Sequence, residues 1–166
     1  MLLWLAAALA LLQFASGLWA LGGGDGQMRE QPAATVRPAA VMQGVLAALS
    51  FGALMLLFVR TDLSVLLVAS NSHSDKPFVF KLAGTWGNHE GSMLLWATVM
   101  GLAGALVALF ERRLPENTIV ATLSAQAFVS LGFYAFLLFS SNPFERLDPV
   151  PLAGAGLNPL LQDIGL

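Results

Sequence analysis

The chain has 166 residues, of which 57% are hydrophobic and only 11% charged, and its formal net charge is −2 at pH 7. So short a chain cannot hide that much apolar surface in one water-soluble core, which excludes an ordinary soluble domain and a disordered chain. The ten Asp and Glu residues outnumber the eight Lys and Arg, which excludes a nucleic-acid binder, and the absence of cysteine excludes disulfides and thiolate metal sites.

Four stretches without a charged residue are long enough to cross a bilayer, which needs about 20 apolar residues. In chain order they are Met1–Leu21, Pro38–Val59, Ser92–Phe110 and Val120–Phe139. Because backbone groups cannot stay unpaired in lipid, each stretch is predicted to be a helix. The first is longer than a signal-peptide core and has no basic residue before it, which favours a retained helix over a cleaved signal. The sequence therefore predicts an all-α integral membrane protein with four transmembrane helices, in one region over residues 1–166.

The connections between these stretches predict an orientation. Segments 22–37 and 111–119 hold four Lys or Arg residues in 25 positions, whereas segment 60–91 and the tail 140–166 hold four in 59. The positive-inside rule assigns the denser pair to the cytoplasm. The middle loop 60–91, the tail and both termini are thus predicted to be extracytoplasmic.

Short apolar runs and small residues predict where these segments pack. Leu63–Ala69 and Phe78–Phe80 are too apolar for free solution, so we expect the middle loop to lie against the membrane surface. Leu63–Ala69 is too short to cross the bilayer, and it either caps the end of the second stretch or lies along the interface. In the third stretch, small residues recur every four positions, which predicts close packing against another helix. The alternative is that Gly and Ala are simply common in membrane helices. The residues concerned are Ala97, Gly101, Ala105, Gly104 and Ala108.

His89 and Glu90, just before the third stretch, are the main candidates for chemistry. A histidine beside a glutamate can bind a metal, relay a proton or ligate haem iron. The alternative is a helix start, with Asn88 as N-cap and Glu90 favourable to the helix dipole. Metal chemistry needs several converging ligands, and no His-Glu-x-x-His or Cys/His cluster is present. We therefore favour the helix start and predict neither a catalytic nor a metal-binding residue.

Several polar segments occur together in one order. They read WGNHEGSMLLW over residues 86–96, SNPF over 141–144 and LNPLLQD over 157–163, preceded by VASNS over 68–72. In order and separation they resemble the N-terminal part of the CcmF family, the membrane haem lyase component of bacterial and plant-mitochondrial cytochrome c maturation. The paralogue for cytochrome c nitrite reductase, NrfE, is almost equally similar.

The resemblance implies a multi-pass protein of the bacterial inner membrane with loop 60–91 and both termini in the periplasm, or of the mitochondrial inner membrane if it is a plant split form. It implies haem as the cofactor. The implied partners are the remaining part of the lyase, other membrane subunits of cytochrome c maturation, a haem chaperone and apocytochrome c. The residues implied for a haem and partner platform are Trp86, Gly87, His89, Glu90, Gly91, Asn158, Pro159, Gln162 and Asp163.

The sequence differs from the family pattern in one respect that concerns haem ligation. The family's Trp-rich segment and haem-ligating histidines match positions beyond Leu166, so neither His73 nor His89 is assigned a haem-ligand role. We therefore expect a fragment or one piece of a split protein, which acts as a scaffold that receives haem and helps to attach it to apocytochrome c. Whether the chain is an enzyme stays open.

The alternative function is a small polytopic transport or assembly subunit without haem chemistry. Transport proteins usually carry ionisable residues inside their membrane spans. None lies in the four stretches, whose strongest polar groups are Gln13, Gln43 and Gln126.

Overall fold

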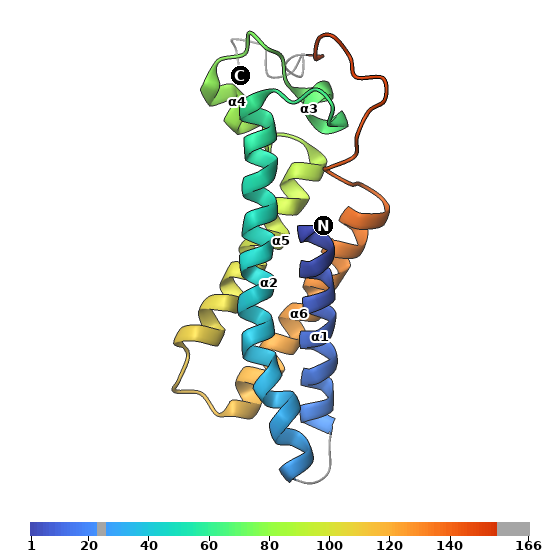
Figure 1. Cartoon of the computed structure of the whole chain (residues 1–166). Helices are drawn as coiled ribbons and strands as arrows, with labels where there is room; N and C mark the ends of the chain where they lie inside the picture. The colour runs from blue at the N-terminus through green and yellow to red at the C-terminus, as the bar shows by residue number, and fades with distance from the viewer. Residues whose placement is uncertain (23–25, 156–166) are drawn as a thin grey trace. The chain divides into compact units, whose positions relative to one another are not determined.

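The computed structural model describes residues 1–22 and 26–155, and over these residues it is helical without a β-strand. In chain order the helices are α1 (Leu2–Gly22), α2 (Gly26–Arg60), α3 (Leu66–Asn71), α4 (Phe78–Gly84), α5 (His89–Phe110) and α6 (Glu116–Phe139) (Figure 1). Four segments are long and apolar enough to cross a membrane: α1, α5, α6 and the part of α2 from Ala33 to Arg60. The predicted all-α fold with four membrane helices is thereby confirmed.

The start of α2 differs from the prediction. The prediction that residues 22–37 form a loop is wrong, because α2 begins at Gly26 and continues through Pro38 to Arg60. A proline inside a helix removes one backbone hydrogen bond, which normally favours a break at that point. Here long-range contacts made by Arg37, the residue just before that proline, favour continuation of the helix.

The Arg37 side chain joins α2 to the connection between α5 and α6. Its Nη1 donates hydrogen bonds to the carbonyl oxygens of Ala108, at 2.7 Å, and Glu111, at 3.2 Å. Its Nη2 lies 3.1 Å from the carboxylate of Glu116 in the first turn of α6. The last carbonyls of a helix lack partners within that helix, so this arginine satisfies groups at the end of α5 while it pairs with α6.

The described residues form two compact units. The first, which we call the helical unit, comprises Met1–Ser50 and Trp96–Ser140. The second, the loop unit, comprises Phe51–Leu95 and the described part of Ser141–Leu166. Helices α2 and α5 each contribute residues to both units.

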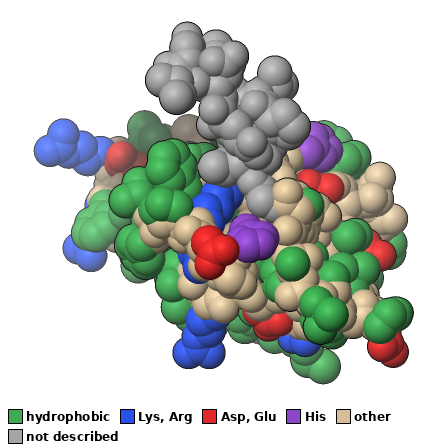
Figure 2. All heavy atoms as spheres, turned by 90° about the horizontal axis from the view of Figure 1, so that it is seen from above, with side chains coloured by type: hydrophobic (Ala, Val, Ile, Leu, Met, Phe, Trp, Pro, Cys, Tyr) green, Lys and Arg blue, Asp and Glu red, His purple; other side chains and the backbone are tan. Residues whose placement is uncertain are grey.

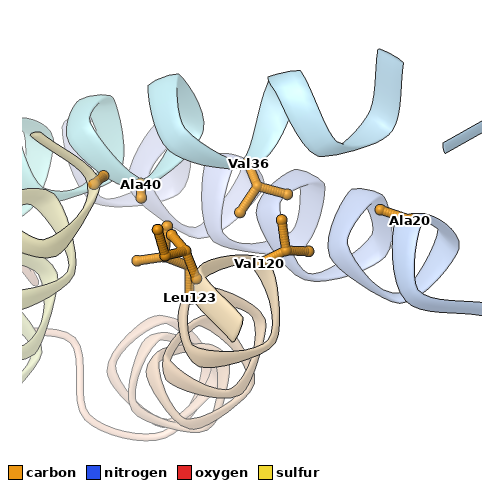
Figure 3. Close-up of a cluster of buried hydrophobic side chains, with 7 residues drawn as sticks. Ala20, Val36, Ala40, Val120 and Leu123 are labelled. Carbon is orange, nitrogen blue, oxygen red and sulfur yellow. The ribbon is translucent and has the colours of Figure 1, made fainter. Parts of the chain in front are cut away.

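Small and β-branched side chains make up most of one buried cluster in the helical unit. This cluster draws on α1, α2, α5 and α6, and Figure 3 labels five of its members. Large apolar side chains such as Trp4, Leu11 and Phe128 are instead more than half exposed. Small residues at the contacts between helices and apolar side chains on the outer surface are typical of helices packed in lipid. The cluster is Ala20, Val36, Ala40, Ala108, Ile119, Val120 and Leu123.

The predicted small-residue stripe on α5 packs closely against α2. A Cβ atom on Gly44 would lie 2.5 Å from the carbonyl oxygen of Gly101, and one on Gly101 would lie 3.1 Å from the Gly44 Cα. Ala97 and Ala105 are both buried on the same stripe. The packing role predicted for these residues is confirmed, with Gly44 as the facing residue that the sequence pattern does not reveal.

The glutamines of the membrane helices form hydrogen bonds between helices. The Nε2 of Gln13 in α1 donates to the Leu123 carbonyl at 2.7 Å and to the Gln126 side-chain oxygen at 2.9 Å, both in α6. The Nε2 of Gln43 in α2 donates to the hydroxyl of Tyr134 in α6 at 2.8 Å. Gln13 and Gln43 are fully buried. Their amides therefore act as packing groups within the bundle.

Candidate functional site

The polar segment that carries the family resemblance forms a short turn between α4 and α5 in the loop unit. α4 follows Pro77, and the chain then turns through residues 85–88. The turn closes with hydrogen bonds from the backbone amides of Trp86 and Gly87 to the carbonyl oxygen of Ala83, at 3.2 and 3.0 Å. The residues after it begin α5, so the whole motif lies at the junction of two helices.

Asn88 binds both of these helices. Its Oδ1 accepts a hydrogen bond from the Gly91 amide at 2.7 Å, which is the side-chain bond of an N-cap residue. Its Nδ2 donates to the carbonyl oxygen of Gly84, the last residue of α4, at 2.7 Å. The helix start predicted at Asn88 is thereby confirmed. One side chain satisfies free backbone groups at the end of α4 and at the start of α5.

Gly91 and Ser92 hold the same turn from the α5 side. A Cβ atom on Gly91 would collide with the carbonyl oxygen of Thr85, so only glycine fits at this position without a shift of the backbone. The Ser92 hydroxyl donates to the carbonyl oxygen of Trp86 at 2.6 Å. The turn is therefore fixed by contacts on both of its sides.

The other platform residues of this turn lie at or near the surface. Trp86 is 41% exposed, Gly87 and His89 are also exposed, and Glu90 is half-buried. The structure thus brings Trp86, Gly87, His89 and Glu90 together on a rigid turn, while Gly91 is buried beneath it. We call the side chains of Trp86, His89 and Glu90 the turn platform. The other four residues of the predicted platform, Asn158, Pro159, Gln162 and Asp163, lie outside the described residues.

The described part of the tail, up to Ala155, runs alongside α3 within the loop unit. Val65 and Arg146 form an isolated antiparallel bridge, with hydrogen bonds of 2.8 Å from the Leu66 amide to the Glu145 carbonyl and from the Leu147 amide to the Ser64 carbonyl. Further along, the Ala155 amide donates to the Ala69 carbonyl at 2.7 Å. These described residues of the tail therefore belong to the folded loop unit.

Asp62 and Arg146 anchor this pairing at its polar end. The Asp62 carboxylate accepts hydrogen bonds from the Ser64 hydroxyl, at 2.6 Å, and from the Ser64 amide, at 3.1 Å. Arg146 donates to the same hydroxyl oxygen at 3.1 Å. The two bonds from Ser64, with a smaller contribution from the charge of Arg146, lower the pKa of Asp62 below its ordinary value of 3.8. The sequence pattern does not reveal this contact, because its partners lie 82 residues apart.

Lysines in the middle loop bind backbone carbonyls. The Nζ of Lys76 donates to the carbonyl oxygen of Asn71, the last residue of α3, at 2.8 Å, and partial burial lowers the pKa of this amine. The Nζ of Lys81 donates to the Ser74 carbonyl at 2.9 Å. Both amines thus stabilise the loop itself.

The two histidines belong to different local structures. His73 Nδ1 accepts a hydrogen bond from the Asp75 amide at 3.3 Å and lies 3.6 Å from the Asp75 carboxylate. Among the residues that the structure describes, no three His, Asp or Glu side chains converge as metal ligands would. In the face that Figure 2 shows, hydrophobic side chains lie next to acidic, basic and histidine side chains.

Comparison with known proteins identifies related chains. A family model described as cytochrome C assembly protein matches residues 86–166. The cytochrome c-type biogenesis protein ccl1 of Rhodobacter capsulatus is 48% identical over 133 residues, 80% of this chain and 20% of that protein. The cytochrome c-type biogenesis protein CcmF of Pseudomonas aeruginosa is 44% identical over 163 residues, 98% of this chain and 24% of that protein.

A solved structure has the same fold. The cytochrome c haem lyase CcmF superposes with a TM-score of 0.78 at 26% identity, over 89% of this chain and 24% of that one. The chain thus spans about a fifth to a quarter of the length of the relatives it matches.

Proposed function

Because this chain belongs to the CcmF/CycK/NrfE family of cytochrome c-type biogenesis proteins and matches their N-terminal part, we propose that it is the membrane scaffold of a haem lyase. It is a multi-pass membrane protein of a family that acts in cytochrome c maturation. In this role it helps to receive haem and to present it for attachment to apocytochrome c. The reaction centre lies on the residues that complete the lyase.

The main support for this proposal is the position of the turn platform at the surface of a turn that other side chains hold in place. Asn88, Gly91 and Ser92 fix the turn, Trp86 and His89 are exposed, and Glu90 is half-buried. A rigid turn with one aromatic and two titratable side chains at its surface suits a binding role. The conformation of the motif therefore supports recognition of a ligand or partner at this end of α5.

The turn platform fits a haem contact better than haem ligation. The exposed Trp86 ring offers a flat apolar surface of the kind that stacks on a porphyrin. Ligation of haem iron needs an axial side chain held at a defined position. The described residues hold His73 beside Asp75 and His89 at the exposed start of α5, which do not form a shared site. We therefore assign Trp86 to the porphyrin face and leave iron ligation to the rest of the lyase.

The proposed location is the bacterial inner membrane, with the middle loop, the tail and both termini on the periplasmic side. Within the helical unit, Arg37 at the start of α2 binds the connection between α5 and α6, which carries Arg112 and Arg113. These three arginines therefore belong to one end of the unit, as a cytoplasmic end requires. The proposed partners are the rest of the lyase, other membrane subunits of maturation, a haem chaperone and apocytochrome c.

Complementation tests the proposed function. The chain is co-expressed with the remaining part of the lyase in a strain that lacks the whole protein, and covalently bound haem in a c-type cytochrome is measured by haem staining. The variants Trp86→Ala and His89→Ala/Glu90→Ala should reduce haem attachment, while immunoblots show unchanged amounts of the chain in the membrane.

The matched control is His73→Ala/Asp75→Ala, which removes the other histidine–acid pair of the same loop. It should leave haem attachment unchanged. Full maturation with all three platform side chains removed would exclude them from the site. Failure of the unsubstituted chain to complement would reject the scaffold role itself, in favour of a transport or assembly subunit without haem chemistry.

A further inference from the structure

Helix α4 exposes apolar side chains over most of its surface. None of its residues is buried, and Phe78, Val79 and Phe80 are 62%, 70% and 49% exposed. Consecutive residues of an α-helix are separated by about 100°, so these three side chains cover more than half of the circumference. A helix that is apolar on so much of its surface needs an apolar environment around it.

The other apolar run of the middle loop does not share this property. Leu67, Val68 and Ala69 in α3 are at most 7% exposed, and they pack into the core of the loop unit. Because protein covers these side chains, their apolar character does not require contact with lipid, and the place of Leu63–Ala69 at the end of the second span or along the interface stays a prediction. Other parts of the protein cover Leu67, Val68 and Ala69, whereas the described residues leave Phe78, Val79 and Phe80 exposed.

α4 also lies next to the start of a membrane-crossing helix. The hydrogen bond from Asn88 Nδ2 to the Gly84 carbonyl, 2.7 Å long, joins the last residue of α4 to the N-cap of α5. α5 is long and apolar enough to span the bilayer, and it has a single acidic residue, Glu90, in its first turn. The end of α4 is thus adjacent to the N-terminal end of a candidate membrane span, the part of a span that lies near the boundary between acyl chains and headgroups.

We propose that α4 is an interfacial helix, with Phe78, Val79 and Phe80 inserted into the phospholipid boundary beside α5. Such helices bury their apolar face about 5–10 Å into the headgroup and acyl boundary. The only charge in α4 is Lys81, and its amine is bound to the Ser74 carbonyl at 2.9 Å. Insertion is therefore driven by apolar area, and a zwitterionic bilayer is sufficient.

Single cysteines test this proposal cleanly, because the chain has none of its own. Cysteine is placed at Phe78, Val79 or Phe80 of the full chain in phosphatidylcholine nanodiscs and labelled with a nitroxide. Collisions with oxygen, which prefers lipid, and with a water-soluble nickel chelate are then compared by electron paramagnetic resonance. The control position is Asp75, whose side chain is 93% exposed.

The expected result is that oxygen collisions exceed nickel collisions at all three α4 positions, with the reverse at Asp75. Nickel collisions equal to those at Asp75 would overturn the proposal by placing α4 in water. Protection from both reagents would overturn it by placing α4 under protein, such as the rest of the lyase or a second copy. If one spin-labelled variant fails to fold, an NBD fluorophore at Val79 distinguishes the same environments by its emission. Quenchers attached to lipid reduce this emission only if the label lies at the membrane interface.

Discussion

Two variants of Asn88 distinguish the contributions of its two side-chain hydrogen bonds to the stability of the turn between α4 and α5. In Asn88→Ala, α5 loses its N-cap bond to the Gly91 amide and α4 loses the bond to the Gly84 carbonyl. An N-cap side chain contributes about 1 kcal/mol and a neutral hydrogen bond about as much, so local opening of the turn becomes easier by about 2 kcal/mol. In Asn88→Asp the acceptor remains and only the donor is lost, so the expected cost is about 1 kcal/mol.

Hydrogen exchange measures this local effect without unfolding the membrane helices. Amide exchange of peptides covering residues 85–95, in detergent micelles, should accelerate about 30-fold in Asn88→Ala and about fivefold in Asn88→Asp. Asn142→Ala is the matched control, because Asn142 caps a local turn in the tail by accepting the Phe144 amide at 3.0 Å. It should leave exchange in this peptide unchanged. Equal acceleration in the two Asn88 variants would refute the two separate roles of its side chain.

Three further predictions concern packing and charge. Gly91→Ala should lower thermal stability in detergent by about 1–3 kcal/mol because its Cβ overpacks the turn, whereas Gly52→Ala in α2, where a Cβ meets nothing within 4 Å, should raise it by up to about 1 kcal/mol. A double-mutant cycle of Gln43→Leu and Tyr134→Phe, measured by unfolding in SDS, should give a coupling of about 0.6–1.7 kcal/mol, and a value near zero would contradict their hydrogen bond. Because the folded pKa of Asp62 lies below its ordinary value of 3.8, its stabilising contribution is present above pH 3.8 and is lost as pH falls through the folded value. Asp62→Asn should therefore be less stable than the unsubstituted chain at neutral pH, and the difference in melting temperature should vanish in strong acid.

The sequence predicts the features of this fold that depend on local composition. Four uncharged stretches are sufficient to identify the membrane helices, because lipid leaves the backbone no other way to pair its groups. Asn88 is likewise predictable as an N-cap, since its amide acts on residues only three positions away. The small residues on α5 predict a close approach of another helix, and Gly101 makes it.

Features that depend on distant residues are not predictable in this way. Segment 26–37 reads as a proline-containing loop, yet it is helical, with Arg37 bound to groups more than 70 residues away. The tail pairs with α3 through contacts that leave no local pattern. The need for glycine at position 91 also follows from a collision with Thr85 across the turn, which only the three-dimensional structure reveals.

The bonds of Arg37 tie both flanks of the connection between α5 and α6 to α2, in addition to the packing of the helices themselves. The guanidinium contacts Ala108 before the connection and Glu116 after it, so both flanks are tethered to α2 independently of residues 112–115. A protease that cuts after Arg112 or Arg113 should therefore leave two polypeptides that migrate as one particle in gel filtration. The same position is a permissive site for an inserted epitope tag or for a gene divided into two reading frames.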